Sequence, residues 1–312
     1  MPAPLRSAAG SHSLPRVSSR ERSLLPLLAL VGVTAVWGVT FVQVKDALAL
    51  YPLFAFLAVR FAISTVALAP FAWPALRELP RRGYAVGVGV GTLLAAAYGL
   101  QTAGLELTTV ASTGFITGLY VVFTPLLALV LLGTPVPRAL WFGVALAVGG
   151  LLLLNGAPGG SALGNALVLA NAVFQAFQIT AMERYAPRYD ARALTFLMMA
   201  TCLVSFAVLA VALGELEVPR GGVVWGALLV TGLFAGALGY LVATWVQART
   251  TAARAALVFT LEAPFAALFG VLLAGEVLGR AGWLGCAVMM VGIVLAVPAA
   301  SETLRRLVPR RR

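Results

Sequence analysis

Charged side chains are scarce in this chain, and their scarcity excludes most soluble folds. Only 11% of the 312 residues are Asp, Glu, Lys or Arg, whereas about one quarter is typical of soluble globular domains. Hydrophobic residues make up 61% of the chain. This composition is typical of a protein that crosses a membrane several times.

Histidine and cysteine are nearly absent, which removes the usual metal ligands and nucleophiles of enzymes. The single histidine, His12, lies in a stretch rich in Ser, Pro and Arg, and both cysteines, Cys202 and Cys286, lie in apolar segments. Their positions support no disulfide pairing and no zinc-ligand spacing. Since there is also no cluster of acidic residues and no nucleotide-binding motif, we predict no metal, no cofactor and no catalytic residue.

Apolar segments of membrane-spanning length are abundant. About 20 apolar residues are needed to cross the hydrocarbon core of a bilayer. Polar residues divide the chain into ten such segments: 25–44, 53–72, 84–105, 109–132, 139–156, 162–182, 191–213, 222–246, 251–274 and 281–298. We therefore predict an all-α polytopic membrane protein with ten transmembrane helices. Residues 1–24 and 299–312 are expected to be basic cytoplasmic tails, the first one disordered and leading into an uncleaved signal anchor.

The two halves of the chain carry the same pattern, 142 residues apart. Its members are Tyr98, Thr102, Thr108, Thr109, Trp141, Gly143 and Gly150, which recur as Tyr240, Thr244, Thr250, Thr251, Trp283, Gly285 and Gly292. This duplication predicts two repeats of five helices each, residues 25–156 and 162–298. Because five is an odd number, the second repeat must be inverted in the membrane, as in transporters that open alternately to either side of one site.

The arginines predict the orientation of these helices. With both termini in the cytoplasm, 18 Lys and Arg residues lie on the cytoplasmic side and only Lys45, Arg220 and Arg280 lie outside, as the positive-inside rule requires. The net charge of +11 is thereby explained without a nucleic-acid partner, since the basic residues flank membrane spans and do not gather on one folded face.

Several segments resemble bacterial drug/metabolite transporters of the EamA type. They are Ala35 to Val42 (AVWGVTFV), Val59 to Phe61 (VRF), Thr108 to Gly133, and Leu261 to Ala296 with its Gly275-Glu276 pair. One departure is that Gly133-Thr134 stands where many members have a second Gly-Glu pair. The resemblance implies a bundle of two inverted five-helix repeats, a central substrate cavity, a bacterial inner-membrane location and export of small metabolites or drugs.

Polar and aromatic residues form stripes within the apolar spans. A polar side chain facing lipid is costly, so such stripes favour a cavity. The residues predicted to bind a small-molecule substrate near the membrane midplane are Trp37, Tyr98, Gln101, Tyr120, Asn171, Gln175, Gln178, Tyr240 and Thr244. The alternative, that the same groups only pack and form hydrogen bonds between helices, stays open.

Two ionisable residues, Arg60 and Glu262, are expected in the middle of spans, where neither can face lipid cheaply. Glu262 is a candidate for coupling transport to protons; alternatively, Arg60 and Glu262 form a buried ion pair or bind backbone carbonyls and water. Pro125 and Pro264 each lack an amide hydrogen and are expected to break their helices.

These observations predict a secondary transporter that exports amino acids, similar metabolites or drugs by alternating access. A membrane receptor or scaffold and an integral membrane enzyme are the alternatives; the first needs no inverted repeat and the second finds no reactive cluster. The spans 139–156 and 281–298 carry few polar groups, so they are expected at the periphery, facing lipid or forming a homodimer.

Overall fold

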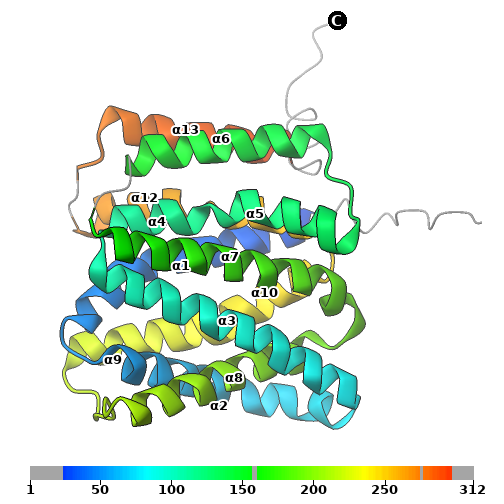
Figure 1. Cartoon of the computed structure of the whole chain (residues 1–312), viewed down its shortest axis with the longest axis vertical. Helices are drawn as coiled ribbons and strands as arrows, with labels where there is room; N and C mark the ends of the chain where they lie inside the picture. Colours follow the sequence, from blue (N-terminus) through cyan, green and yellow to red (C-terminus); the bar gives the residue numbers. More distant parts are fainter. Residues whose placement is uncertain (1–23, 157–159, 275–276, 297–312) are drawn as a thin grey trace, which may run out of the picture.

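The computed structural model describes residues 24–156, 160–274 and 277–296, and every regular element in these ranges is a helix (Figure 1). In chain order these are α1 (Leu24–Leu48), α2 (Leu53–Arg77), α3 (Arg81–Leu107), α4 (Val110–Gly118), α5 (Tyr120–Leu127), η2 (Ala128–Leu132), α6 (Arg138–Asn155), α7 (Ala162–Tyr185), η3 (Ala186–Arg188), α8 (Ala191–Ala212), α9 (Gly222–Leu229), η4 (Val230–Leu238), α10 (Gly239–Gln247), α11 (Ala252–Phe259), α12 (Glu262–Ala274) and α13 (Arg280–Ala296). The predicted all-α membrane fold is confirmed.

Ten spans emerge when consecutive helices are joined. Nine spans of the described residues are long and apolar enough to cross a bilayer, and α13, with 17 residues, is a shorter apolar helix. The first two spans are longer than predicted, because α1 continues to Leu48 and α2 to Arg77. Their last turns carry Lys45 and Arg77, which a helix tolerates where it leaves the hydrocarbon. Of the predicted tails, Leu24 already belongs to α1, and the other residues lie outside the described ranges.

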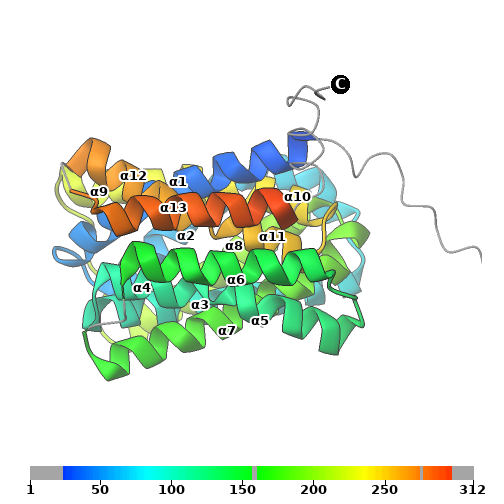
Figure 2. The same cartoon turned by 90° about the horizontal axis from the view of Figure 1, so that it is seen from above.

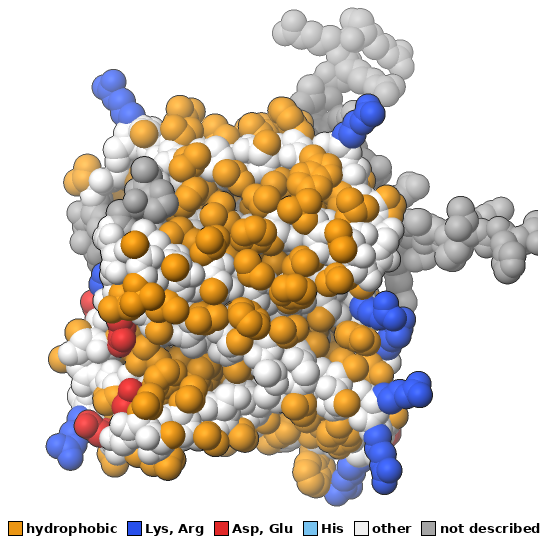
Figure 3. Space-filling view, in the orientation of Figure 1, with side chains coloured by type: hydrophobic (Ala, Val, Ile, Leu, Met, Phe, Trp, Pro, Cys, Tyr) orange, Lys and Arg blue, Asp and Glu red, His pale blue; other side chains and the backbone are white. Residues whose placement is uncertain are grey.

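The charged side chains gather at the two ends of the helices. In Figure 3 most of the visible Lys and Arg side chains lie along the right edge of the molecule, and most of the visible Asp and Glu side chains lie along the left edge. We call the first the arginine-rich end; its described arginines are Arg77, Arg81, Arg82, Arg138, Arg184, Arg188, Arg192, Arg249 and Arg254. The opposite end carries Lys45, Arg220 and Arg280 together with Asp46, Glu106, Glu215 and Glu217.

Equivalent helices of the two repeats pack against each other. The two last helices, α6 and α13, lie side by side at one edge of the molecule, and α2 and α8 lie at the other (Figures 1 and 2). A methyl group at Gly143 would lie 2.9 Å from the carbonyl oxygen of Gly292, and one at Gly150 would lie 2.7 Å from that of Gly285. Gly143 thus contacts the repeat counterpart of Gly150, and Gly150 contacts the repeat counterpart of Gly143. A two-fold axis produces such reciprocal contacts.

The glycine faces of α6 and α13 are thus occupied within one chain. Their outer faces carry exposed apolar side chains, among them Phe142, Leu152, Trp283 and Leu284. A homodimer through these two helices stays a prediction, and it has to use the outer faces.

Both repeats contain a span that is interrupted at the same place. The fourth span breaks at Leu119, between α4 and α5, and the ninth breaks at Thr260 and Leu261, between α11 and α12. The 142-residue offset relates Leu119 to Leu261. Irregular backbone at membrane depth leaves polar groups without helical partners, so it is stable only where it is buried in protein or lines a cavity.

The α6–α13 contact gives a direct test of the packing. Gly150→Ala should lower the melting temperature of the purified protein, because the added methyl group meets the Gly285 carbonyl and overpacking costs about 1–3 kcal/mol. Gly149→Ala is the matched control, since nothing lies within 4 Å of a methyl group there. Both changes gain the same helix propensity, about 1 kcal/mol. Equal melting temperatures for the two variants would contradict this helix contact.

Candidate functional site

A small chamber lies at the centre of the bundle, between helices of both repeats. Its volume is about 40 Å³. Its lining side chains are Trp37, Ala97, Tyr98, Gln101, Thr117, Tyr120, Asn171, Gln175, Tyr240, Phe259 and Glu262. These residues come from α1, α3, α4, α5, α7, α10, α11 and α12, so most of the helices that meet at the centre contribute to the wall.

A second chamber of about 40 Å³ adjoins the first and extends toward the opposite end. The two chambers share Trp37, Tyr98, Gln101 and Glu262. The second one adds Arg60. Each chamber has room for about one water molecule, whose share of liquid volume is roughly 30 Å³.

The chamber wall follows the two-fold relation between the repeats. Tyr98 and Tyr240 are equivalent residues, and the hydroxyl of Tyr240 donates a hydrogen bond to that of Tyr98 at 3.2 Å. Two further equivalent pairs also line the first chamber, Thr117 with Phe259 and Tyr120 with Glu262. Equivalent residues can meet only near the axis that relates the repeats, so this axis passes through the chamber.

Aromatic rings form one side of the chamber. The ring of Trp37 lies 5.2 Å from that of Tyr240 and 5.3 Å from that of Phe259, measured between centroids. Its indole nitrogen donates a hydrogen bond to the carbonyl oxygen of Ala235 at 3.0 Å. Ala235 lies in the π-helical segment η4, whose wide turns occur often at functional sites. The segment thus holds Trp37 in place as a flat apolar wall.

Amide side chains form another side. Gln101 and Asn171 both donate to the hydroxyl oxygen of Thr117, at 3.2 Å and 3.3 Å. Thr117 is in the last turn of α4, next to the interruption of the fourth span. The three residues join α3, α4 and α7 around the chamber. Gln175 lies one turn after Asn171 and also lines the chamber.

Arg60 and Glu262 face the second chamber without touching. The guanidinium of Arg60 lies over the Tyr98 ring, 4.8 Å from its centroid, and donates to the Tyr98 hydroxyl at 3.3 Å. Its buried Nε atom has no hydrogen-bond partner. Among the described residues the ion pair at contact distance is Arg192–Asp190. The alternative of a contact ion pair between Arg60 and Glu262 is therefore wrong for this conformation.

Two of the nine predicted binding residues lie away from the chambers. Gln178 is buried and donates to the sulfur of Met198 at 3.8 Å. The hydroxyl of Thr244 accepts a hydrogen bond from that of Thr195 at 3.0 Å. Both partners are on α8, so these two residues join helices, whereas the other seven line the first chamber.

A comparison with family models matches nearly the whole chain. The model of the EamA-like transporter family matches residues 24–156 and again residues 162–297. The chain belongs to the EamA-like transporter family. It is therefore a multi-pass membrane transporter, and the twofold match agrees with the internal repeat.

Two individual proteins are similar to this EamA-like chain. An uncharacterized transporter of Archaeoglobus fulgidus is 29% identical over 269 residues, covering 86% of this chain and 84% of the relative. The crystal structure of another protein has a TM-score of 0.71 at 21% identity and covers 94% of this chain and 100% of the other. At this identity the second similarity shows the fold alone.

Pro125 and Pro264 were predicted to break their helices. Relative to the interruptions of the fourth and ninth spans, they lie at different positions. Pro264 lies in the first turn of α12, where a missing amide hydrogen leaves no carbonyl unpaired within the helix. Pro125 lies inside α5, and the interruption precedes it at Leu119. Helix α5 continues through Pro125, so a helix break caused by this proline stays a prediction. The amide of Leu119 bonds the carbonyl of Ile116, so the chain tightens there before Pro125 is reached.

Sequence reasoning missed Phe259 and the carbonyl of Ala235. Phe259 is apolar and lies in an apolar span, so its residue type gives no sign that it lines a cavity. The repeat offset does identify it, since Phe259 is the counterpart of Thr117, a polar residue within an apolar span. The π-helical segment η4 has no comparable signal in the sequence.

The contacts of Tyr98 predict a ranking of stabilities. Tyr98→Phe removes an acceptor from the buried Arg60, and a hydrogen bond to a charged group is worth about 1.5–3 kcal/mol. Tyr240→Phe removes only a neutral bond, worth about 0.5–1.5 kcal/mol. Thermal melting should therefore rank Tyr98→Phe below Tyr240→Phe. The control is Tyr84→Phe, a partly exposed tyrosine bonded to a backbone carbonyl. A Tyr98→Phe protein as stable as the control would show that Arg60 does not depend on this hydroxyl.

Proposed function

We propose that this transporter exports small, partly apolar metabolites, amino acids above all, by alternating access around the central chambers. The observation that carries the proposal is the arrangement of Arg60 and Glu262, which face one chamber from different helices without neutralising each other. A ligand with a carboxylate and an ammonium group has a partner at each end. The aromatic side around Trp37 suits an apolar side chain between them.

The unpartnered Nε atom of Arg60 supports this assignment. Leaving a buried donor without a partner costs about 1–3 kcal/mol. A substrate carboxylate would satisfy it and form a charge-assisted bond, which is stronger than a neutral one. Glu262 begins α12 and would receive the substrate ammonium or a coupled proton.

The chambers must enlarge before a metabolite enters. Small-molecule sites have volumes of about 300–1,000 Å³, whereas each chamber has about 40 Å³. The interruptions next to Tyr120 and Glu262 supply places where the fourth and ninth spans bend. Since they are equivalent in the two repeats, bending one opens the site to one side and bending the other opens it to the opposite side.

The arginine-rich end is assigned to the cytoplasm of a bacterial cell, with the protein in the inner membrane and both termini inside. The basis is the positive-inside rule. Export then runs from the arginine-rich end toward the opposite end.

Flux measurements in proteoliposomes test the proposal. Purified protein is reconstituted, and uptake of amino acids, nucleobases and cationic dyes is compared with that of protein-free vesicles. Saturable, competable flux of amino acids is expected. Flux of cationic dyes with none of amino acids would contradict a substrate that needs both Arg60 and Glu262.

A bulky side chain at the chamber wall should block transport. Gln175→Trp fills a chamber of about 40 Å³ and is expected to reduce amino-acid flux at least tenfold, a loss of about 1.4 kcal/mol in the transport barrier. Val173→Trp, on another side of α7, is the control and should retain most of the flux. Equal loss in both variants, at normal melting temperatures, would mean that α7 is merely intolerant of large residues.

Replacing Glu262 tests energy coupling separately. If Glu262 carries the coupled proton and the substrate ammonium needs only a neutral hydrogen-bond acceptor there, Glu262→Gln should abolish uptake driven by a pH gradient and leave substrate exchange without a gradient largely intact; loss of both would mean that the Glu262 carboxylate binds the ammonium. The amide cannot take up and release a proton, whereas binding and helix movement remain. Glu106→Gln is the control, because Glu106 is exposed at the opposite end of α3.

Thermal melting of the same variants distinguishes a structural role. A purely structural Glu262 predicts that Glu262→Gln loses stability and that Arg60→Gln in the same protein restores part of it. A stable Glu262→Gln protein that still responds to the pH gradient as the parent does would remove the coupling hypothesis.

A further inference from the structure

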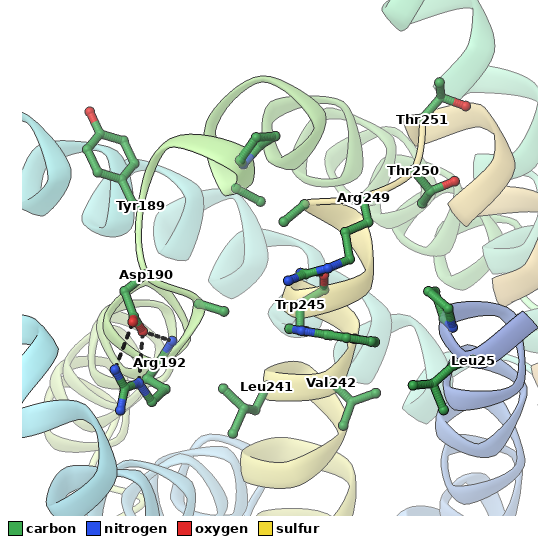
Figure 4. Close-up of a pocket in the computed structure, with 15 residues that line it drawn as sticks. Leu25, Tyr189, Asp190, Arg192, Leu241, Val242, Trp245, Arg249, Thr250 and Thr251 are labelled. Atoms are coloured by element: carbon green, nitrogen blue, oxygen red, sulfur yellow. Dashed lines mark hydrogen bonds and ion pairs between the residues drawn. The ribbon is translucent and has the colours of Figure 1, made fainter. Parts of the chain in front are cut away.

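A large groove lies at the arginine-rich end, apart from the central chambers. Its volume is about 1140 Å³, and none of its lining residues lines either chamber. Figure 4 shows its floor on α10, where Trp245 lies between Asp190 and Arg192 on one side and Leu25 of α1 on the other. We call it the basic groove.

The basic groove faces outward from the bundle. Along α10, Tyr240 and Thr244 are buried toward the centre, at 5% and 1% exposure. Leu241, Val242 and Trp245 lie on the other side of the helix, are only partly buried, and line the groove. An apolar surface on the outside of a membrane-spanning helix meets lipid.

The groove is deep enough to hold an acyl chain. From Arg249, just past the end of α10, to Leu241 the helix rises about 12 Å at 1.5 Å per residue. One leaflet of the hydrocarbon core is about 15 Å thick. The groove therefore runs from the membrane surface through most of one leaflet.

Charge is concentrated where the groove reaches the surface. The guanidinium of Arg249 lies over the Trp245 ring at 4.4 Å and donates to the Trp245 carbonyl at 2.6 Å. Arg192 also lines the groove, and two of its nitrogens bond the carboxylate of Asp190. Among the described residues no carboxylate pairs with Arg249. The mouth thus offers one arginine without an acidic partner, Arg249, and a second, Arg192, whose charge Asp190 neutralises.

The helices of the other repeat pack closely near the equivalent place. There the first turns of α7 pack tightly against α3, and a methyl group at Gly104 would lie 2.9 Å from the carbonyl oxygen of Gly164. The corresponding end of α1, at Leu25, lines the groove. The closed side ends in Glu106 and the open side in Arg249.

We propose that the basic groove binds an anionic phospholipid, with its phosphate at Arg249 and Arg192 and an acyl chain along Leu241, Val242 and Trp245. Interfacial arginines attract anionic headgroups, and tryptophan is enriched at the membrane–water interface. A bound lipid would hold α1 against α10 at the arginine-rich end.

Thermal melting with added lipid tests the proposal. Full-length protein in detergent is titrated with phosphatidylglycerol or phosphatidylcholine. Phosphatidylglycerol is expected to raise the melting temperature at a lower concentration. Arg249→Gln should raise its half-saturating concentration about fivefold, since one arginine near the surface is worth about 1 kcal/mol. Arg138→Gln, at the same end but outside the groove, should leave it unchanged.

Replacing Asp190 should change the half-saturating lipid concentration in the opposite direction. Asp190→Asn keeps a good cap for α8 and releases Arg192, so it should lower the half-saturating concentration of phosphatidylglycerol. Val242→Trp, which places an indole on the apolar wall of the groove, should weaken the lipid effect without lowering the melting temperature in detergent alone.

Four results would overturn the proposal. The first is equal stabilisation by both lipids, and the second is an Arg138→Gln effect as large as that of Arg249→Gln. The third is equal stabilisation by free glycerol 3-phosphate, which would make the mouth a soluble-anion site. A change of oligomeric state in the groove variants without any lipid dependence would assign the groove to a second copy of the chain.

Discussion

The hydroxyl groups of Tyr98 and Tyr240 touch across the centre of the molecule, and this contact constrains much of the remaining architecture. Two equivalent residues of a repeat meet only on the axis that relates the copies. An axis in the membrane plane reverses the second copy, so whatever surrounds it is reached from both sides in equivalent ways. The chamber surrounds it. The same axis makes α6 and α13 exchange glycine contacts, Gly143 with Gly292 and Gly150 with Gly285.

The two-fold relation between the repeats also explains why the fourth and ninth spans are interrupted at equivalent places. A broken helix at membrane depth exposes carbonyl and amide groups that lipid cannot satisfy. Here both interruptions lie next to chamber residues, Tyr120 and Glu262. The protein interior therefore shields the broken backbone, and the breaks lie beside the candidate site. The π-helical segment η4 works similarly, since its Ala235 carbonyl accepts the Trp37 indole and so gains a partner.

The ten spans and their repeat could be predicted from the sequence, because apolar length and a fixed offset are local properties. Seven of the nine proposed binding residues line one chamber, since a polar stripe reports which face of a helix avoids lipid. It does not report which neighbour that face meets. Gln178 and Thr244 share stripes with chamber residues, yet α8 lies against them and supplies Met198 and Thr195 as partners. Such partners depend on tertiary packing, which no single-helix pattern encodes.

A symmetric scaffold presents the same chemistry to both ends of whatever lies on its axis. An amino acid has two different ends, so a site for it requires the equivalent positions to differ. The scaffold contacts keep the symmetry, with glycine opposite glycine between α6 and α13. The chamber wall breaks it, with Tyr120 opposite Glu262 and Thr117 opposite Phe259. Glu262 of the second repeat and Arg60 of the first line the same chamber. The chamber therefore has a negative and a positive side, which can tell the two ends of an amino acid apart. In the function proposed here, selectivity would come from the positions where the repeats differ, and alternating access from those where they agree.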